Sequence, residues 1–134
     1  RNGCTALIGS IASNNYDLIK LLLDNGADPN IAQHKNMSTA LMLASLGDNI
    51  DMIKALIDAG AYINAKNNNG DTALMWASFG GHIATVKLLL EKGANPNFIT
   101  IDGNTALTYN SKAADNQSNY NNIKKLLKKH GAKK

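Results

Sequence analysis

The chain of 134 residues repeats itself with a period of about 33 residues, and this period limits the possible folds more than any other feature. A Thr-Ala-Leu triplet begins at Thr5, Thr39, Thr72 and Thr105, so successive copies lie 34, 33 and 33 residues apart. In the first three copies a glycine follows 21 residues after the threonine, whereas in the last copy it follows after 26. A fixed period of this length is typical of solenoids, in which each unit buries its apolar face by stacking on its neighbours.

Each copy predicts two short antiparallel helices. Threonine is a good N-cap because its hydroxyl group accepts a hydrogen bond from an amide that has no partner within the helix, and Ala-Leu then starts the first helix. The second helix has apolar residues at helical spacing, as in Val86, Leu89 and Leu90. A closing glycine then fits the left-handed position after the helix end, and these glycines are Gly26, Gly60, Gly93 and Gly131.

Tight turns are predicted in front of the first helices. Asn-Gly at residues 2–3 and 69–70, and Asp-Gly at residues 102–103, are strong turn signals. The second copy has Asn36 and Met37 in this place and one extra residue before them. Its hairpin tip should therefore be longer than the others or differently shaped.

The copies resemble the ankyrin repeat family in their period, in the Thr-x-Leu that opens one helix, in the Leu-Leu of the next, and in the Gly-Ala-Asp/Asn-x-Asn that follows. The resemblance covers the chain from Asn2 to Ala132. It implies an all-α repeat fold, an ankyrin-repeat solenoid of stacked helix-turn-helix units joined by β-hairpin-like turns. The expected domain is single, residues 1–134, with four repeats at about 2–33, 34–66, 67–99 and 100–132.

One family feature is absent from every copy. The family's Thr-Pro-Leu-His is Thr-Ala-Leu in this chain, followed by Ile8, Met42, Met75 or Thr108. The proline that presets the first helical turn and the histidine that braces neighbouring repeats are therefore both missing. Alanine is an excellent helix former and methionine fills irregular gaps, so this departure bears on local stability more than on the fold.

The two ends of the repeat array differ in polarity. At two positions of the second helix that are apolar in the other copies, the last copy has Lys124 and Lys128. These positions share one helix face, which predicts that the last repeat is a C-terminal cap. The first copy has Ile8 and Ile11 without a polar face, so we expect that further repeats or another domain precede Arg1 and that the chain is a fragment of a longer one.

Charge and composition exclude several classes of function. Residues 1–110 hold seven Lys/Arg against nine Asp/Glu, whereas residues 111–134 hold seven against one, so the basic character belongs to the C-terminal segment. Cys4 is the only cysteine, which excludes an internal disulfide and a Cys-rich metal site and favours a reducing, cytoplasmic compartment. The three histidines have neither ligand spacing nor triad spacing. The sequence therefore predicts no enzyme activity, no metal and no cofactor.

The resemblance implies that partners dock on a concave side formed by the first helices and the hairpin tips. Four and seven residues after the threonines, this register gives Leu43, Leu46, Trp76, Phe79 and Tyr109 as groove residues. The polar turn residues that would form a rim are Lys35, Asn36, Asn68, Asn69, Asp71, Ile101, Asp102 and Asn104. Aromatic residues at helical spacing often fill a core instead, but the register predicts that Trp76 and Phe79 face outward and bind a partner.

The predicted function is that of a non-catalytic scaffold, monomeric, which binds a protein partner in its concave groove and has no small-molecule substrate. One alternative makes the chain the targeting arm of a larger enzyme or of a secreted effector. A second alternative is binding of nucleic acid or of a membrane surface through the Lys-rich C-terminus, which the capping role of the lysines makes less favoured. The insertion in the last copy, around residues 112–122, is predicted to be a tolerated surface loop, and the alternative is a loop that makes a specific contact.

Overall fold

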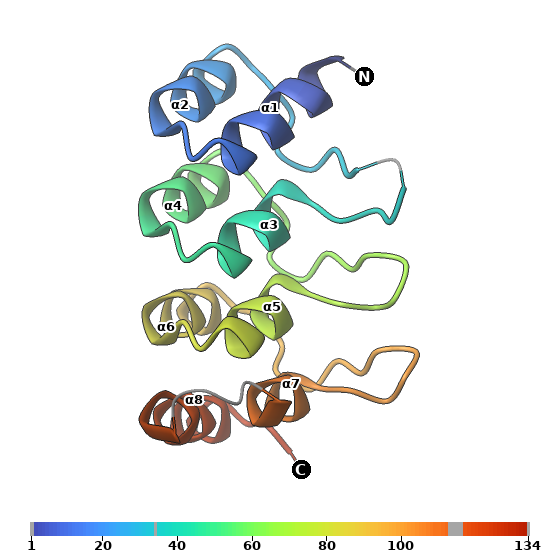
Figure 1. Cartoon of the computed structure of the whole chain (residues 1–134), viewed down its shortest axis with the longest axis vertical. Helices are drawn as coiled ribbons and strands as arrows, with labels where there is room; N and C mark the ends of the chain where they lie inside the picture. The colour runs from blue at the N-terminus through green and yellow to red at the C-terminus, as the bar shows by residue number, and fades with distance from the viewer. Residues whose placement is uncertain (1, 34, 113–116, 134) are drawn as a thin grey trace.

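The computed structural model describes residues 2–33, 35–112 and 117–133, and over these residues it contains eight α-helices and no β-strand. The predicted all-α class is confirmed. The helices form four pairs, each made of an odd-numbered helix and the even-numbered helix that returns beside it (Figure 1). Their bounds are α1 Asn2–Ala12, α2 Tyr16–Asp24, α3 Ala40–Leu46, α4 Ile50–Asp58, α5 Ala73–Gly80, α6 Ile83–Glu91, α7 Ala106–Lys112 and α8 Gln117–Lys129.

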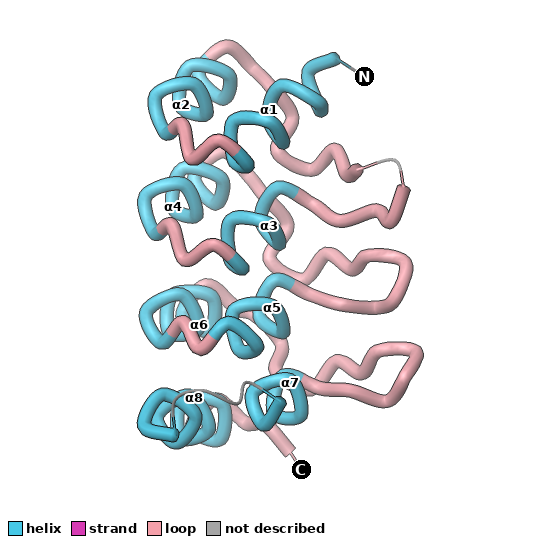
Figure 2. Tube along the Cα trace, in the orientation of Figure 1, coloured by secondary structure: helices cyan, strands magenta, loops and turns pink. Residues whose placement is uncertain are grey.

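The helix pairs stack along one direction, and the two ends of the chain lie at opposite ends of the stack (Figure 1). The odd-numbered helices form one layer and the even-numbered helices form the other, with α5 packed against both α3 and α7 and with α8 packed against α6. The long loops between pairs project away from the helices, beyond the odd-numbered layer (Figure 2). We call the surface formed by these loops and the odd-numbered helices the groove side.

The threonine N-caps form as predicted in the interior of the stack. The Thr39 hydroxyl accepts a hydrogen bond from the Met42 amide at 3.2 Å, and the Thr72 hydroxyl accepts one from the Met75 amide at 3.3 Å. The expectation for the first copy is wrong, because α1 begins at Asn2 and runs through both the predicted Asn2-Gly3 turn and Thr5. Thr39 and Thr72 follow hairpins and have extended backbones, at ψ 164° and 167°, whereas the helix that contains Thr5 already begins three residues before it.

The closing glycines adopt the predicted left-handed conformation, with φ between 89° at Gly26 and 99° at Gly60. In the hairpins, Gly70 and Gly103 also have positive φ, and Met37 takes the equivalent position at φ 62°. The second hairpin is longer, as predicted. Its closing backbone bond joins residues 33 and 38, whereas the bonds of the next two hairpins join residues 67 and 71 and residues 100 and 104.

A repeated asparagine joins each helix pair to the next. The Asn30 side chain donates to the Gly60 carbonyl at 3.0 Å and accepts from the Tyr62 amide at 2.7 Å. Asn64 and Asn97 make the same two contacts one and two pairs further along the chain. This residue is the last one of the Gly-Ala-Asp/Asn-x-Asn pattern, so each copy of the pattern holds the following pair in register.

The core lies between the pairs and is mainly apolar, with some buried polar side chains such as Ser45 and Asn110. Ile53 and Val86 are fully buried, whereas Lys124 at the equivalent position of α8 is exposed, as is Lys128 one turn further on. At the opposite end, Leu21 of α2 is 59% exposed. None of the helices in the described part of the chain combines the length and the apolar character needed to cross a bilayer.

Candidate protein-binding groove

The five predicted groove residues lie on three helices that pack side by side, α3, α5 and α7. Phe79 and Leu46 are 47% and 43% exposed, whereas Leu43, Trp76 and Tyr109 are partly buried. Trp76 packs against the core with one part of its ring system while another part remains accessible. Its side chain is therefore neither wholly in the core nor wholly exposed, and its part in binding a partner stays a prediction.

Four of these side chains enclose a pocket on the groove side. Leu46, Trp76, Phe79 and Tyr109, together with Asp71, line an open pocket of about 270 Å³. The rings of Phe79 and Tyr109 meet edge to face, with centroids 6.3 Å apart and planes at 85°. This is a favourable arrangement for an aromatic pair, and it links α5 to α7 at the pocket wall. We call these five residues the aromatic pocket.

Asp71 belongs to the pocket and not to the rim, so this part of the prediction is wrong. The residue is only 8% exposed because it immediately precedes the N-cap Thr72, where the chain passes from the hairpin into α5. Its Oδ1 atom accepts hydrogen bonds from the Tyr109 hydroxyl at 2.6 Å and from Asn69 Nδ2 at 3.1 Å, and its Oδ2 atom accepts from Asn67 Nδ2 at 3.2 Å. All three donors are uncharged, and no cationic side chain that the structure describes pairs with this carboxylate.

The surroundings of Tyr109 in the pocket raise the pKa of its hydroxyl. Burial raises the pKa of its hydroxyl to about 12, and the hydrogen bond to Asp71 and the negative charges of Asp71 and Asp102 add to this increase. Tyr109 is therefore a neutral hydrogen-bond donor at physiological pH. The Tyr109 hydroxyl, which comes from α7, holds the Asp71 carboxylate in place.

The remaining rim residues lie on the hairpin loops around the pocket. Lys35, Asn36, Asn68, Ile101 and Asp102 are exposed, and Ile101 reaches 78%. Asn69 and Asn104 are partly buried because each also bonds within its own hairpin or helix start. Neighbouring hairpins are tied by the backbone, since the Asn68 amide donates to the Asn36 carbonyl and the Ile101 amide donates to the Asn69 carbonyl, both at 3.0 Å.

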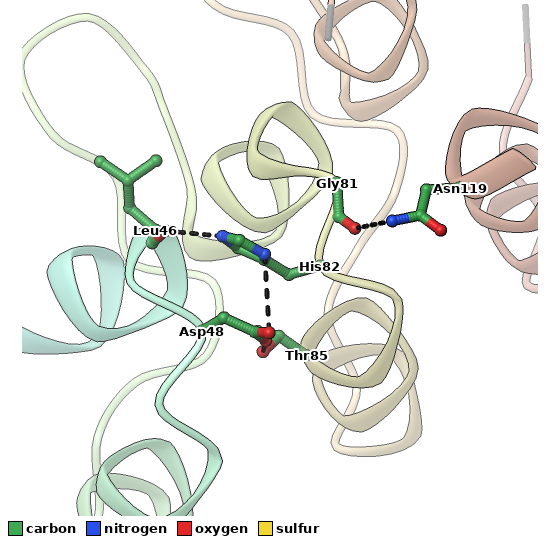
Figure 3. Close-up of polar contacts among 6 residues, drawn as sticks. All are labelled: Leu46, Asp48, Gly81, His82, Thr85 and Asn119. Atoms are coloured by element: carbon green, nitrogen blue, oxygen red, sulfur yellow. Dashed lines mark hydrogen bonds and ion pairs between the residues drawn. The ribbon is translucent and has the colours of Figure 1, made fainter. Parts of the chain in front are cut away.

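Polar contacts at the turns between the paired helices join three helix pairs (Figure 3). The residues involved are Leu46, Asp48, Gly81, His82, Thr85 and Asn119. His82 Nε2 lies 2.7 Å from the carbonyl oxygen of Leu46, so this nitrogen carries the proton and donates to it. The other ring nitrogen lies 3.6 Å from a carboxylate oxygen of Asp48, and the Thr85 hydroxyl donates to the other carboxylate oxygen at 2.7 Å. These contacts fix the backbone of Leu46, and with it one wall of the aromatic pocket.

The insertion of the last copy is only partly a loop. α8 begins at Gln117 and has 13 residues, whereas α2, α4 and α6 have nine each. Asn119 Nδ2 in its first turn donates to the Gly81 carbonyl at 3.1 Å, so the added residues contact the third pair (Figure 3). Residues 113–116 lie outside the described residues. Among those that are described, no three His, Cys, Asp or Glu side chains are grouped so as to hold a metal ion.

Comparison with known families agrees with the repeat pattern. A family model for ankyrin repeats, which holds three copies, matches residues 7–100 and residues 41–134. The two ranges overlap, so the match does not itself give the number of repeats. The described helices form four pairs. No curated protein matches the sequence.

Proposed function

The chain belongs to the ankyrin repeat family, whose repeats are generally protein–protein interaction modules, and we propose that it is a non-catalytic scaffold that binds a protein partner on its groove side. The partner would contact the aromatic pocket and the exposed rim residues of the neighbouring hairpins. In the alternative of a targeting arm, the same groove would deliver a larger enzyme or effector to that partner.

The observation that carries this proposal is the aromatic pocket itself. Phe79 and Leu46 expose nearly half of their surface beside Trp76 and Tyr109, and the hairpins of the same side carry exposed polar residues such as Asn68 and Asp102. Exposed apolar patches with a polar rim mark interaction sites, and Trp and Tyr are over-represented among the residues whose truncation costs about 2 kcal/mol or more of binding free energy. The pocket is built on helices, so little conformational freedom would be lost on binding.

The test compares three forms of the protein as bait for affinity capture from the cells that produce it. The groove variant is Trp76→Ala/Phe79→Ala. The matched control is Leu21→Ala/Tyr62→Ala, which truncates one aliphatic and one aromatic side chain that are exposed outside the pocket, at 59% and 68%. Thermal unfolding of all three forms is measured first, so that a loss of binding can be separated from a loss of fold.

We expect a protein that wild type and the control retain and that the groove variant loses. Direct titration of the purified partner should then show at least a tenfold weaker dissociation constant for the groove variant. A partner held equally by all three baits would contradict the proposed site and would direct attention to the hairpin tips or to α8.

A second candidate function rests on the lysines of α8. Lys124, Lys125, Lys128 and Lys129 are all exposed and line one shallow surface, and capping accounts for Lys124 and Lys128 only. Such a surface attracts anionic polymers or anionic lipid. Binding of a single-stranded RNA or of anionic vesicles that weakens steeply with salt, and that Lys125→Glu/Lys129→Glu abolishes, would support it. Binding that these substitutions leave unchanged would argue against it.

A further inference from the structure

The aromatic pocket combines aromatic rings with a carboxylate. The rings of Trp76, Phe79 and Tyr109 line it together with Asp71. The faces of aromatic rings are electron-rich and attract cations, most strongly in the case of Trp. The Asp71 carboxylate, whose Oδ1 atom accepts from the Tyr109 hydroxyl, adds a negative charge beside these rings.

The charge of Asp71 is not balanced within the described structure. Its three hydrogen-bond donors, Asn67, Asn69 and Tyr109, are neutral, and neither of the ion pairs that the structure describes includes it. Buried carboxylates are normally paired with a cation, because removing a lone charge from water is costly. The pocket is open to solvent at its mouth, so a cation could reach the carboxylate from outside the molecule.

We propose that the aromatic pocket binds a cationic side chain of the protein partner, either an arginine guanidinium or a lysine ammonium with or without methyl groups. This inference rests on the proposed function and specifies which chemistry the partner must present. The cation would lie against the faces of Trp76 and Phe79 and would be drawn towards Asp71.

Three further observations agree with a cationic ligand. Burial is the main cause of the raised pKa of Tyr109, and the negative charges of Asp71 and Asp102 beside it raise that pKa further. Residues 1–110, which contain the groove, hold nine acidic against seven basic side chains. The molecule also contains this kind of contact internally, because Lys66 Nζ lies 3.9 Å from the centroid of the Phe98 ring.

An uncharged side chain fits the same pocket less well. A leucine or phenylalanine of a partner would cover the mouth and remove water from Asp71 without supplying a positive charge. The resulting desolvation of the carboxylate opposes binding. Charge complementarity therefore selects a basic segment over an apolar one.

The experiment uses the whole chain and a set of capped pentapeptides that differ only in the central residue, with glycine on both sides. The central residue is arginine, lysine or trimethyl-lysine, or one of the neutral isosteres citrulline and norleucine. Binding is followed by the NMR shift of the Trp76 indole N–H, which is unambiguous because the chain has one tryptophan. We expect at least one cationic peptide to bind at least fivefold more tightly than its neutral isostere, and the strongest of the three identifies the cation.

Two variants test the role of the carboxylate. Asp71→Asn should weaken the cationic peptide at least tenfold, whereas Asp58→Asn, which removes an exposed carboxylate on α4, should leave its affinity unchanged. Tyr109→Phe keeps the ring and removes one of the two hydrogen bonds to the Oδ1 atom of Asp71, leaving that of Asn69, so the cationic peptide should bind as well as to wild type or more tightly. If Asp71→Asn proves unfolded, the peptide series and Tyr109→Phe still decide the question.

The proposal is overturned if neutral and cationic peptides bind alike, if none of them shifts the indole signal, or if Asp71→Asn binds as wild type does. Its failure is distinguishable from failure of the proposed function. A partner captured through Trp76 and Phe79, combined with indifference to charge in the peptide series, would leave the groove in place and exclude only the cation.

Discussion

The first and third helix pairs have the same backbone arrangement but carry different side chains on the groove side. Where α5 has Trp76 and Phe79, α1 has Gly9 and Ala12. A Cβ atom added to Gly9 would meet nothing within 4 Å, whereas the side chains of α5 form the aromatic pocket. The repeat pattern therefore determines the two helix layers but not the residues at these positions. The third pair supplies two side chains to the pocket, and Leu46 and Tyr109 add to it from the same positions of the neighbouring pairs.

The two pairs also differ in how well their shared apolar positions are buried. Four residues before the closing glycine, Leu22 of α2 is partly buried and Leu89 of α6 is fully buried. The reason is that α6 packs between α4 and α8, while α2 has a neighbouring pair on one side only. The contribution of each leucine to the free energy of unfolding therefore depends on its position within the stack more than on its residue type.

The largest expected effect is therefore the difference between two equivalent leucine truncations. Leu89→Ala should lower the free energy of unfolding by about 3 kcal/mol, because it leaves a cavity between two pairs. Leu22→Ala should cost roughly 1 kcal/mol, since part of that side chain is already in water. Urea denaturation followed by circular dichroism measures both. Equal losses would show that the terminal pair is as well supported as an interior one.

Alanine substitutions of two equivalent threonines, Thr72 and Thr5, should differ less in their effect on the free energy of unfolding. Thr72→Ala removes the hydroxyl that accepts from the Met75 amide and should cost about 1 kcal/mol. Thr5 lies inside α1, so Thr5→Ala should change stability by no more than a few tenths of a kcal/mol. The same denaturation series tests this pair. A loss at Thr5 as large as that at Thr72 would indicate that α1 begins at Thr5 in solution.

Two glycines in the groove-side helices should respond in opposite directions to alanine. Gly9→Ala should stabilise the chain by about 0.8 kcal/mol, because alanine is the better helix former and the position is open. At Gly80 the added Cβ would collide with the His82 ring, so Gly80→Ala should displace that ring from the Leu46 carbonyl and lower the melting temperature. Stabilisation at both positions would mean that the His82 bond contributes little.

The smallest expected effect on folding stability comes from the titration of Tyr109 and is confined to alkaline pH. The pKa of Tyr109 is raised from 10.0 to about 12 in the folded chain, so between these values the unfolded chain loses the proton while the folded chain keeps it. The stability contributed by this hydroxyl is complete below pH 10 and is lost as the pH rises towards 12. Wild type should therefore lose stability more steeply than Tyr109→Phe over this range in denaturation curves. Parallel curves would show that neither burial nor Asp71 raises the pKa of Tyr109 in the folded chain.

The sequence allowed the fold to be predicted because its signals are local and repeated. Threonine caps, closing glycines and apolar spacing each act within one helix, and their recurrence along the chain gives the register of the stack. The longer second hairpin followed from one extra residue in the same way. The start of α1 was mispredicted because the Thr-Ala-Leu signal is the same in every copy, whereas Thr39 and Thr72 have the extended backbone of an N-cap and Thr5 lies inside a helix.

The candidate site was predictable only in part, because its geometry depends on contacts between distant residues. The register gave Trp76 and Phe79, but the inward position of Asp71 depends on the hydroxyl of Tyr109, 38 residues away. The bond from His82 to Leu46 spans 36 residues. Asn67 was missed as a pocket support because its role is to hold Asp71, and a run of asparagines in a turn carries no sign of which one points inward.

The most direct test of the central claim, that the aromatic pocket is where the partner binds, is acrylamide quenching of the fluorescence of Trp76, the only tryptophan of the chain. The free protein should be quenched as a partly accessible indole is, with an emission maximum at longer wavelength than that of a buried one. Saturation with the captured partner, in a tryptophan-free form, should protect the indole and reduce the quenching constant severalfold. Quenching that stays unchanged at saturation would contradict the account.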